Sequence, residues 1–276
     1  CTATFTVSAP PPVTLTCPAP VTVSCVSEVP APDITSVTVN SGCGVVVTHQ
    51  GDVISGQTCA NRYTITRTYR ATDQCGNFAE CTQVITVNDQ TPPVITCPAP
   101  VTVSCASAVP APNTASVIAT DNCGGVVTVT HISDVISNQT CANRYTITRT
   151  YRATDVCGNF AECTQIITVN DQTPPTLTCP APVTVSCAAA VPAPNIAAVT
   201  GVSDNCGGVV TVTHVSDVIS NQTCANRYTI TRTYRATDVC GNFAECTQII
   251  TVNDQTPPVI TCPAPITVSC ASAEPA

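Results

Sequence analysis

The chain has 276 residues, a net charge of −8, 21 cysteines and 24 prolines, but no Trp, Met or Lys. This cysteine content is typical of a disulfide framework formed in an oxidising compartment, so we expect an extracellular protein whose leader lies outside this sequence. The acidic charge, the absence of a basic run and the few aromatic residues argue against nucleic acid as a partner, and no apolar run reaches the roughly 18 residues of a membrane span.

Cysteine spacing divides the chain into tandem repeats. Six cysteines recur every 80 to 83 residues, in sets that begin at Cys17, Cys97 and Cys179. A fixed period of this kind indicates an array of similar modules. We expect three whole repeats, preceded by the last strand and linker of another repeat and followed by the first strand of a further one. The boundaries are 1–11, 12–91 (repeat 1), 92–173 (repeat 2), 174–256 (repeat 3) and 257–276.

Each repeat is predicted to consist of strands. In repeat 2 these are VTVSC at 101–105, GGVVTVTH at 124–131, RYTITRTYRATD at 144–155 and FAECTQIITVND at 160–171, which alternate with period two. The Pro98-Ala99-Pro100 step confines the first strand to a sheet edge. No segment has helical periodicity. We therefore expect an all-β fold of tandem immunoglobulin-like β-sandwich repeats, linked by disulfides and arranged as an extended rod.

The pattern of these repeats resembles that of hyalin-type (HYR) repeats, in the cysteine-rich form found in long bacterial surface proteins. Its most specific parts are Cys-Pro after Pro-Pro, Tyr-x-Ala-x-Asp before x-Cys-Gly-Asn, and the Glu-Cys that follows. The resemblance covers essentially the whole chain. It implies an immunoglobulin-like fold and an extracellular adhesive or structural role, and no catalysis. The sequence departs from many relatives by having Tyr69, Tyr151 and Tyr234 where they carry Trp.

The expected sandwich narrows the disulfide pairing, although six cysteines allow fifteen connectivities and sequence alone selects none. Adjacent first and last strands pair the first cysteine with the sixth. Two Asp-x-Cys-Gly turns at one end pair the third with the fifth, and the second and fourth stay at the opposite end. The preferred pairs are Cys17–Cys81, Cys25–Cys59, Cys43–Cys75, Cys97–Cys163, Cys105–Cys141, Cys123–Cys157, Cys179–Cys246, Cys187–Cys224 and Cys206–Cys240.

Two further cysteines lie outside the whole repeats. Cys1 has the position of a sixth cysteine and Cys262 that of a first, so they are candidates for a disulfide between molecules of a polymer. The alternative for Cys1 is a lipid-modified mature N-terminus, which its place in the repeat pattern disfavours.

Acidic residues in the links between repeats predict a Ca²⁺ site. Each link reads VNDQTPP, and the expected topology brings its Asp to the two Asp-bearing turns of the following repeat, a layout loosely similar to cadherin linkers. Carboxylates gathered without a nearby Lys repel one another, and Ca²⁺, with six to eight oxygen ligands, relieves that repulsion. The predicted ligands are Asp89, Asp121 and Asp155 at repeat 2, and Asp171, Asp204 and Asp238 at repeat 3.

Repeat 1 offers an internal comparison. Ala9 in its preceding linker and Ser41 in its first turn replace two of the acids together, as a shared metal site predicts. The alternative is that these Asp residues only form turns, which the persistence of Asp73 in repeat 1 favours. The Asn residues two positions after the fifth cysteine are attributed to the hairpin turn rather than to a metal; they are Asn77, Asn159 and Asn242.

Other polar patterns are given structural explanations. His49, His131 and His214 each precede an Asp by three positions, but residues three apart on a strand point to opposite faces, so no catalytic site is expected. Zinc is not expected because the thiols pair as disulfides. The central Arg of each NRYTITRTYR segment is expected to lie over Tyr at the sheet edge and to pair with a carboxylate such as a nearby Glu or, alternatively, to contact a neighbouring filament or a surface polysaccharide. These are Arg67, Arg149 and Arg232, with Glu80, Glu162 and Glu245.

Asn138 and Asn221 begin Asn-Gln-Thr sequons and are candidate glycosylation sites. Repeat 1 has Gly56 at the same position.

These features predict a non-enzymatic structural component of an extracellular fibre, stalk or adhesin shaft. Its expected partners are neighbouring copies of itself or further repeats of the same chain, with Ca²⁺ as the cofactor. The alternatives are carbohydrate- or surface-binding adhesin repeats, which the few aromatic residues disfavour, and the accessory region of a larger secreted enzyme.

Overall fold

The computed structural model describes residues 1–4, 12–40 and 44–267, which form strands and short 3₁₀ turns and contain no α-helix. They belong to two compact units. Unit 1 contains repeat 1 and most of repeat 2, and unit 2 contains repeat 3 with short segments of repeat 2. Unit 1 comprises Cys1–Val103, Ala108–Gln139 and Tyr145–Val169, and unit 2 comprises Ser104–Ser107, Thr140–Arg144 and Asn170–Ala276.

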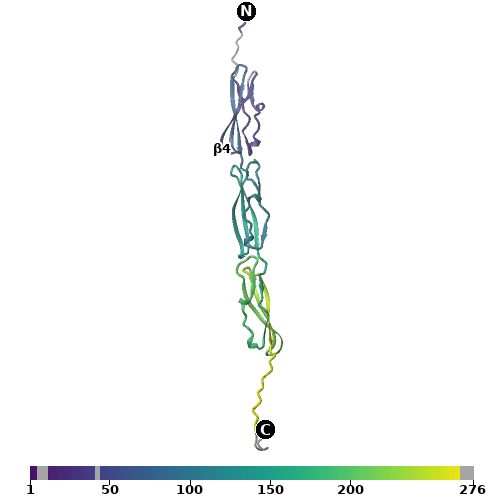
Figure 1. Ribbon diagram of the computed structural model, residues 1–276. Helices are drawn as coiled ribbons and strands as arrows, with labels where there is room; N and C mark the ends of the chain where they lie inside the picture. Colours follow the sequence, from purple (N-terminus) through teal and green to yellow (C-terminus); the bar gives the residue numbers. More distant parts are fainter. Residues whose placement is uncertain (5–11, 41–43, 268–276) are drawn as a thin grey trace. The chain divides into compact units, whose positions relative to one another are not determined.

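The three repeats share one order of elements (Figure 1). Repeat 1 has β1 (Thr14–Thr16), β2 (Val21–Val23), η1 (Val26–Glu28), η2 (Ile34–Ser36), β3 (Thr38–Asn40), β4 (Val46–Cys59), β5 (Arg62–Thr72) and β6 (Phe78–Asn88). Repeat 2 has β7 (Val94–Thr96), β8 (Val101–Val103), η3 (Ala106–Ala108), η4 (Thr114–Ser116), β9 (Ile118–Thr120), β10 (Thr128–Cys141), β11 (Arg144–Thr154) and β12 (Phe160–Asn170). Repeat 3 has β13 (Thr176–Thr178), β14 (Val183–Val185), η5 (Ala188–Ala190), η6 (Ile196–Ala198), β15 (Thr200–Ser203), β16 (Thr211–Cys224), β17 (Arg227–Thr237) and β18 (Phe243–Asn253).

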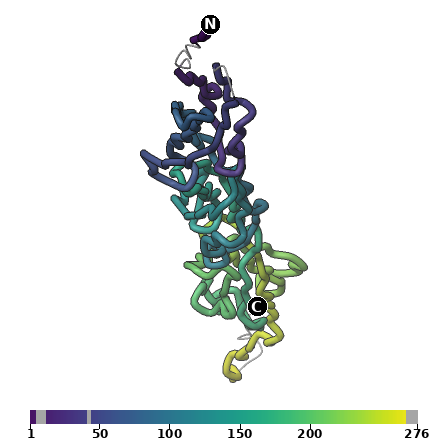
Figure 2. Tube along the Cα trace, turned by 90° about the horizontal axis from the view of Figure 1, so that it is seen from above, coloured from purple at the N-terminus to yellow at the C-terminus, as the bar shows by residue number. Residues whose placement is uncertain are grey.

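Each repeat contains a four-stranded and a two-stranded sheet. In repeat 1 the larger sheet has the order β2-β6-β5-β4, in which β2 is parallel to β6 and the other pairs are antiparallel. The smaller sheet pairs β1 with β3. Repeats 2 and 3 have the same two sheets, and Figure 2 traces the chain through them in sequence colours. The described residues thus form three all-β, sandwich-like repeats, as the strand pattern predicts.

The Pro-Ala-Pro step divides the predicted first strand of repeat 2 into two pieces. β7 pairs with β9 in the small sheet, whereas β8 joins the edge of the large sheet beside β12. Because Pro98 and Pro100 have no N–H to donate, the chain leaves one sheet at this step and enters the other.

The core of each repeat is small. In repeat 1, Tyr63, Ile65, Ile85 and Val87 are buried together on β5 and β6. Tyr69 is also buried, and its hydroxyl oxygen accepts a hydrogen bond of 3.1 Å from the backbone N–H of Asp33. Full burial of one such apolar side chain contributes about 1.5–3 kcal/mol, so a core of this size leaves much of the stability to disulfides.

Asn138 and Asn221 occupy backbone positions with a structural requirement. Both have a φ of 54°, in the left-handed region, and Gly56 has a φ of 63°. Gly and Asn tolerate this region best, which explains why repeat 1 has Gly and repeats 2 and 3 have Asn at this position. The two Asn side chains are exposed on β10 and β16, so glycosylation of these sequons stays a prediction.

Candidate metal centre between consecutive repeats

One disulfide per repeat joins the first cysteine to the sixth. Cys17–Cys81, Cys97–Cys163 and Cys179–Cys246 have Cα–Cα distances of 5.6, 5.7 and 5.7 Å. Each bridge connects the residue after the first short strand with the last long strand of its own repeat. The pairing agrees with the expected neighbourhood of these strands.

The other bridges connect consecutive repeats, and here the expected pairing is wrong. Within unit 1 the second cysteine of repeat 1 bonds the third of repeat 2, and the fourth bonds the fifth; unit 2 repeats this arrangement. The bonds are Cys25–Cys123, Cys59–Cys157, Cys105–Cys206 and Cys141–Cys240. The expected pairs Cys25–Cys59, Cys105–Cys141, Cys123–Cys157 and Cys206–Cys240 are therefore absent.

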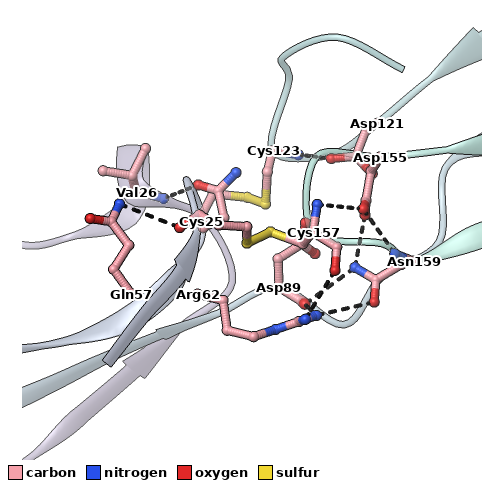
Figure 3. The surroundings of a disulfide bond; sticks show 12 residues. Cys25, Val26, Gln57, Arg62, Asp89, Asp121, Cys123, Asp155, Cys157 and Asn159 are labelled. Atoms are coloured by element: carbon pink, nitrogen blue, oxygen red, sulfur yellow. Dashed lines mark hydrogen bonds between the residues drawn. A yellow bond between two sulfur atoms is a disulfide. The ribbon is translucent and has the colours of Figure 1, made fainter. Parts of the chain in front are cut away.

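The sequence predicted correctly at which end of the repeat the second and fourth cysteines lie, but it predicted the wrong bonding partner for them. Cys25 and Cys59 do lie at one end of repeat 1, since the N–H of Val26 donates to Oδ1 of Asn61 at 2.9 Å. The short linker after β6 brings the two Asp-x-Cys-Gly turns of repeat 2 to that end, and each cysteine bonds a turn instead of its neighbour. Figure 3 shows both bridges side by side.

Several cysteines remain as thiols in the described residues. Cys75, Cys187 and Cys224 are free, so the expected pair Cys187–Cys224 does not form. Cys43, the expected partner of Cys75, lies outside the described residues. Cys1 and Cys262 are free and exposed, and their bond between molecules stays a prediction.

Two of the three predicted carboxylates come together at each junction. Ligand atoms of Asp89, Asp121 and Cys123 lie within 4.8 Å of one another in unit 1. Those of Asp171, Asp204 and Cys206 do the same in unit 2. Since both sulfurs are oxidised in disulfides, the carboxylates are the anionic ligands that each group offers.

Each of the two carboxylates keeps one buried oxygen without a partner. Asp89 follows β6 and is 0% exposed; its Oδ1 accepts from the N–H of Thr91 at 3.1 Å, whereas its Oδ2 has no hydrogen bond. Asp121 follows β9, and its Oδ2 accepts from the N–H of Cys123 at 2.9 Å, whereas Oδ1 is buried and unpartnered. Asp171 Oδ2 and Asp204 Oδ1 are unpartnered in the same way.

A buried carboxylate oxygen without a donor is costly, and two of them in one group add charge repulsion. Arg62, which binds the backbone of this linker, does not hydrogen-bond either oxygen. Arg62 donates from Nη2 to the backbone oxygen of Asp89 at 2.7 Å and from Nη1 to the backbone oxygen of Cys157 at 3.0 Å. A cation with a preference for oxygen ligands fits the unpartnered pair, and Ca²⁺ is the common choice for carboxylates in extracellular proteins.

Asp155 and Asp238 do not join these pairs, contrary to expectation. Oδ1 of Asp155 accepts from the N–H groups of Cys157 at 2.8 Å and Asn159 at 2.9 Å, and Oδ2 accepts from Nδ2 of Asn159 at 2.7 Å. Asp238 makes the same bonds in repeat 3. These carboxylates satisfy their own hairpin turn, as the turn-forming alternative predicts.

Sequence reasoning missed one residue of each junction. Arg62 connects the linker of repeat 1 to the fifth-cysteine turn of repeat 2 through backbone oxygens (Figure 3). Its counterpart Arg144 makes the same bonds to Asp171 and Cys240. Asn159 adds a bond from Nδ2 to the backbone oxygen of Asp89 at 3.2 Å. The Asn-Arg pair that recurs at the start of β5 and of its counterparts is the sequence signal that could have pointed to these Arg residues.

The His and Arg patterns combine into a local ion pair. Nε and Nη2 of Arg67 donate to both oxygens of Asp52 at 2.9 and 2.8 Å, and Nε2 of His49 contacts Oδ1 at 2.9 Å. Arg67 therefore pairs with a carboxylate, as expected, but with Asp52 rather than with Glu80, which pairs with Arg70. Arg149 and Arg232 likewise pair with Asp134 and Asp217 rather than with Glu162 and Glu245.

An irregularity in β4 explains the His contact. The register with β5 shifts between His49 and Gly51, which places one extra residue between His49 and Asp52 and turns both side chains to one face. The hydrogen bond from Arg67 lowers the pKa of the Asp52 carboxyl, partly opposed by burial. Asp52 therefore forms an ion pair with Arg67. The bulge explains why His49, three positions before Asp52, can also contact it.

The sequence matches a family profile described as "HYR-like domain with 4 cysteines" over residues 13–87, 93–169 and 175–252. The chain belongs to this family. Its HYR-like repeats make it an extracellular structural or adhesion module, and the disulfides and strands described above are those of such a module. A search of curated proteins found no match. Within the described residues, no helix is long and apolar enough to cross a membrane.

Solved structures with some likeness include extracellular cadherin repeats. The protocadherin gammaB7 EC3-6 cis-dimer is 12% identical over 87% of this chain and 77% of that chain, with a TM-score of 0.32. Human CDH23 EC21-23 is 16% identical over 84% and 98%, with a TM-score of 0.30. Drosophila N-cadherin EC1-3 is 12% identical over 86% and 98%, with a TM-score of 0.33.

Proposed function

We propose that this HYR-like chain is a structural part of an extracellular fibre, stalk or adhesin shaft, in which disulfides join consecutive repeats and Ca²⁺ stiffens the joints. The observation that carries the proposal is the pair of bridges between repeats 1 and 2, Cys25–Cys123 and Cys59–Cys157. Together with the peptide linker they make three covalent connections at one junction. A pulling load on such a junction is borne by covalent bonds instead of a noncovalent interface.

The sequence separations of these bridges add to the argument. Each closes a loop between residues 98 apart, which is longer than one whole repeat. A bridge that closes about 100 residues removes unfolded-state entropy worth about 4 to 5 kcal/mol. Repeats with small cores gain most from this, which supports a role that demands resistance to heat, proteases and force.

Ca²⁺ is the second part of the proposal. Asp89 Oδ2 and Asp121 Oδ1 in one junction, and Asp171 Oδ2 and Asp204 Oδ1 in the other, are the residues that would hold it. Ca²⁺ would supply the positive charge that these buried oxygens lack, and backbone oxygens or water would complete its shell. Such a cation joins the linker to the first turn of the following repeat, beside the disulfide.

Small-angle X-ray scattering of the oxidised chain tests the shaft. We expect the distance distribution of an elongated particle, and a compact distribution would contradict the rod. The same measurement after reduction of the disulfides is expected to show increased flexibility between repeats.

Isothermal titration with Ca²⁺ tests the metal. We expect two sites per chain with dissociation constants of about 10⁻⁴–10⁻³ M, the range of extracellular modules. D89N/D121N removes one site, and D171N/D204N in addition removes the other. D155N is the matched control, because Asp155 has its oxygens satisfied by its own turn. Binding that persists in the fourfold variant would exclude this site.

A second candidate function is binding to a surface such as a polysaccharide. Phe78, Phe160 and Phe243 recur once per repeat and are about half exposed, at 57, 51 and 50%. The guanidinium carbon of Arg70 lies 4.2 Å from the ring centre of Phe78 and covers one ring face. Cosedimentation with insoluble polysaccharides, with F78A/F160A/F243A as the control, separates this candidate from a purely mechanical shaft.

A further inference from the structure

The four-stranded sheet of each repeat has two faces with different surroundings. In repeat 1 the residues of β5 alternate between buried and half-buried, as in a sandwich whose second sheet lies against one face only. Residues that pair across strands share a face, so the register identifies the other face on β4 and β6 as well. We call this the outer face; on β5 it comprises Thr64, Thr66, Thr68, Arg70 and Thr72.

Large apolar side chains are exposed on the outer face of repeat 1. Val53 and Val84 flank Thr66 in one row across the sheet and are 65 and 39% exposed. Phe78 lies further along β6 on the same face and is 57% exposed. Outward positions of a sandwich are normally polar, and a group of exposed apolar side chains indicates an interaction surface.

The same surface recurs in the other repeats. In repeat 3, Val218 and Ile249 flank Thr231 and are 56 and 37% exposed. Repeat 2 has the same residue types at the equivalent positions of its large sheet, which are Val135, Ile166 and Phe160. Each repeat therefore presents an outer face of its own.

The outer face carries no net charge, although the chain is acidic. In repeat 1, Arg70 and Glu80 are the only ionised side chains that the register places on it between Thr64 and Thr72. Nε and Nη2 of Arg70 donate to Oε1 of Glu80 at 2.8 and 2.6 Å, so the two charges cancel. Two chains that each carry a net charge of −8 can therefore meet through this face without like charges in the contact.

The size of one outer face limits its affinity. β5 has 11 residues, so three long strands cover about 36 Å by about 14 Å, or roughly 500 Å². A stable interface buries roughly 800 Å² per partner, which one outer face does not provide. Because the face recurs once per repeat, several weak contacts on one chain can act together. The β-branched Thr and Val side chains also have little χ1 freedom to lose when a partner covers them.

We propose that the outer face binds the outer face of a second copy of this chain, so that shafts associate side by side. Sheets pack face to face at a spacing of about 10 Å, which brings Val53 and Val84 of each copy against the other copy's sheet. A second copy fits because it presents the same neutral face at the same period of 80 to 83 residues. This inference names a partner for the proposed shaft and rests on it.

A polysaccharide is the competing occupant, and the observations favour it less. The guanidinium carbon of Arg70 lies 4.2 Å from the ring centre of Phe78 and covers one ring face that a sugar would need. Val53 and Val84 offer methyl groups, which do not hydrogen-bond the hydroxyl groups of a sugar. Apolar rows of this kind match a second apolar row instead.

Sedimentation equilibrium of the full oxidised chain, from micromolar to millimolar concentration, tests the proposal. Iodoacetamide blocks any thiol, so that only noncovalent association is measured. We expect reversible self-association, seen as an average mass that rises with concentration. V53E/V218E places a carboxylate on the outer face of repeats 1 and 3, and it should move this rise to concentrations at least about tenfold higher, because an unpaired charge is costly to bury.

I34E/I196E is the matched control, because it adds the same two charges in the same repeats. Ile34 and Ile196 lie in η2 and η6 and are 45 and 52% exposed. The N–H of Asp33, which precedes Ile34, donates to the hydroxyl of Tyr69, a buried residue on the opposite face of β5 from the outer face. Self-association should therefore be unchanged in this control.

A mixture of V53E/V218E with V53R/V218R should associate again, because opposite charges then meet across the contact. Such recovery also shows that both variants fold. A parent chain that stays monomeric, equal weakening by V53E/V218E and I34E/I196E, or no recovery in the mixture would overturn the proposal. So would a monomeric parent that cosediments with polysaccharide through this face. If scattering at low concentration still shows an elongated monomer, only the side-by-side contact fails and the shaft stands.

Discussion

Two turns of repeat 2 share the Asp-x-Cys-Gly spacing and differ in the state of the carboxylate. In the turn 121–125, Asp121 accepts one N–H and keeps a buried oxygen without a partner. In the turn 155–159, Asp155 accepts three hydrogen bonds and has no such oxygen. The difference lies in the fifth residue, which is Gly125 in one turn and Asn159 in the other. The same Asp-x-Cys-Gly spacing thus gives a candidate metal ligand in one turn and a self-contained turn in the other, where the N–H and Nδ2 of Asn159 supply two of the three hydrogen bonds to Asp155.

The two turns are equivalent in their disulfides, because the cysteine of each turn bonds repeat 1 across a loop of the same length. We expect C25S/C123S and C59S/C157S each to lower the free energy of unfolding by about 4 to 5 kcal/mol, because both bridges close loops of the same length. Urea unfolding in chelator measures both variants. A large effect from one pair alone would show that the two turns contribute unequally to the junction.

Removal of each carboxylate should separate the turns. D155A loses three hydrogen bonds, two of them from backbone N–H groups, and we expect a loss of about 1–3 kcal/mol with or without Ca²⁺. D121A should cost less in chelator, since it also removes an unpartnered oxygen, and should abolish the gain from Ca²⁺ at this junction. Thermal melts of both variants in Ca²⁺ and in chelator provide the measurement. Identical responses would contradict the distinction.

Exchange of the fifth residue tests its cause directly. Gly125 has a φ of 86°, a positive value at which any side chain is strained and Asn less so than most, and an added Cβ would meet Val156 at 3.7 Å, an ordinary contact. We expect the G125N amide to satisfy Asp121 and to weaken Ca²⁺ binding at this junction by about tenfold, the equivalent of one hydrogen bond. G124A, in the same turn, is the control for a changed glycine that adds no amide. Calorimetric titration of both variants decides the point, and unchanged affinity in G125N would disprove the role of the fifth residue.

The smallest expected effect concerns pH. In repeat 1 the hydrogen bond from Asn77 lowers the pKa of Asp73 from its ordinary value of 3.8. A folded-state pKa below the unfolded value means that the stabilisation is present above about pH 4 and is lost as the pH falls through the lowered pKa. N77G is expected to return the pKa of Asp73 toward 3.8. Titration by nuclear magnetic resonance follows this carboxyl, and an unshifted pKa in the parent chain would contradict the assignment.

Much of the fold and part of the site were predictable from the sequence. The alternation of the long strands predicted β5, β6 and their counterparts, and the Pro-Ala-Pro step predicted an edge strand. The carboxylates of Asp89 and Asp121 were predicted to meet, and their ligand atoms do lie within one group. The contact of His49 with Asp52 was not predictable, because a single bulge reverses the side of the strand on which residues lie.

The sequence by itself determined three features of this protein: the period of its repeats, their strand composition and their cysteine count. These depend on local pattern, which is written along the chain. Only the tertiary structure decided which cysteines join consecutive repeats, because Cys25 and Cys59 lie at one end of repeat 1 and both bond the next repeat. The choice between a partner in the same repeat and one in the next depends on how closely a short linker brings two repeats together, and the positions of cysteines along a chain do not contain that distance.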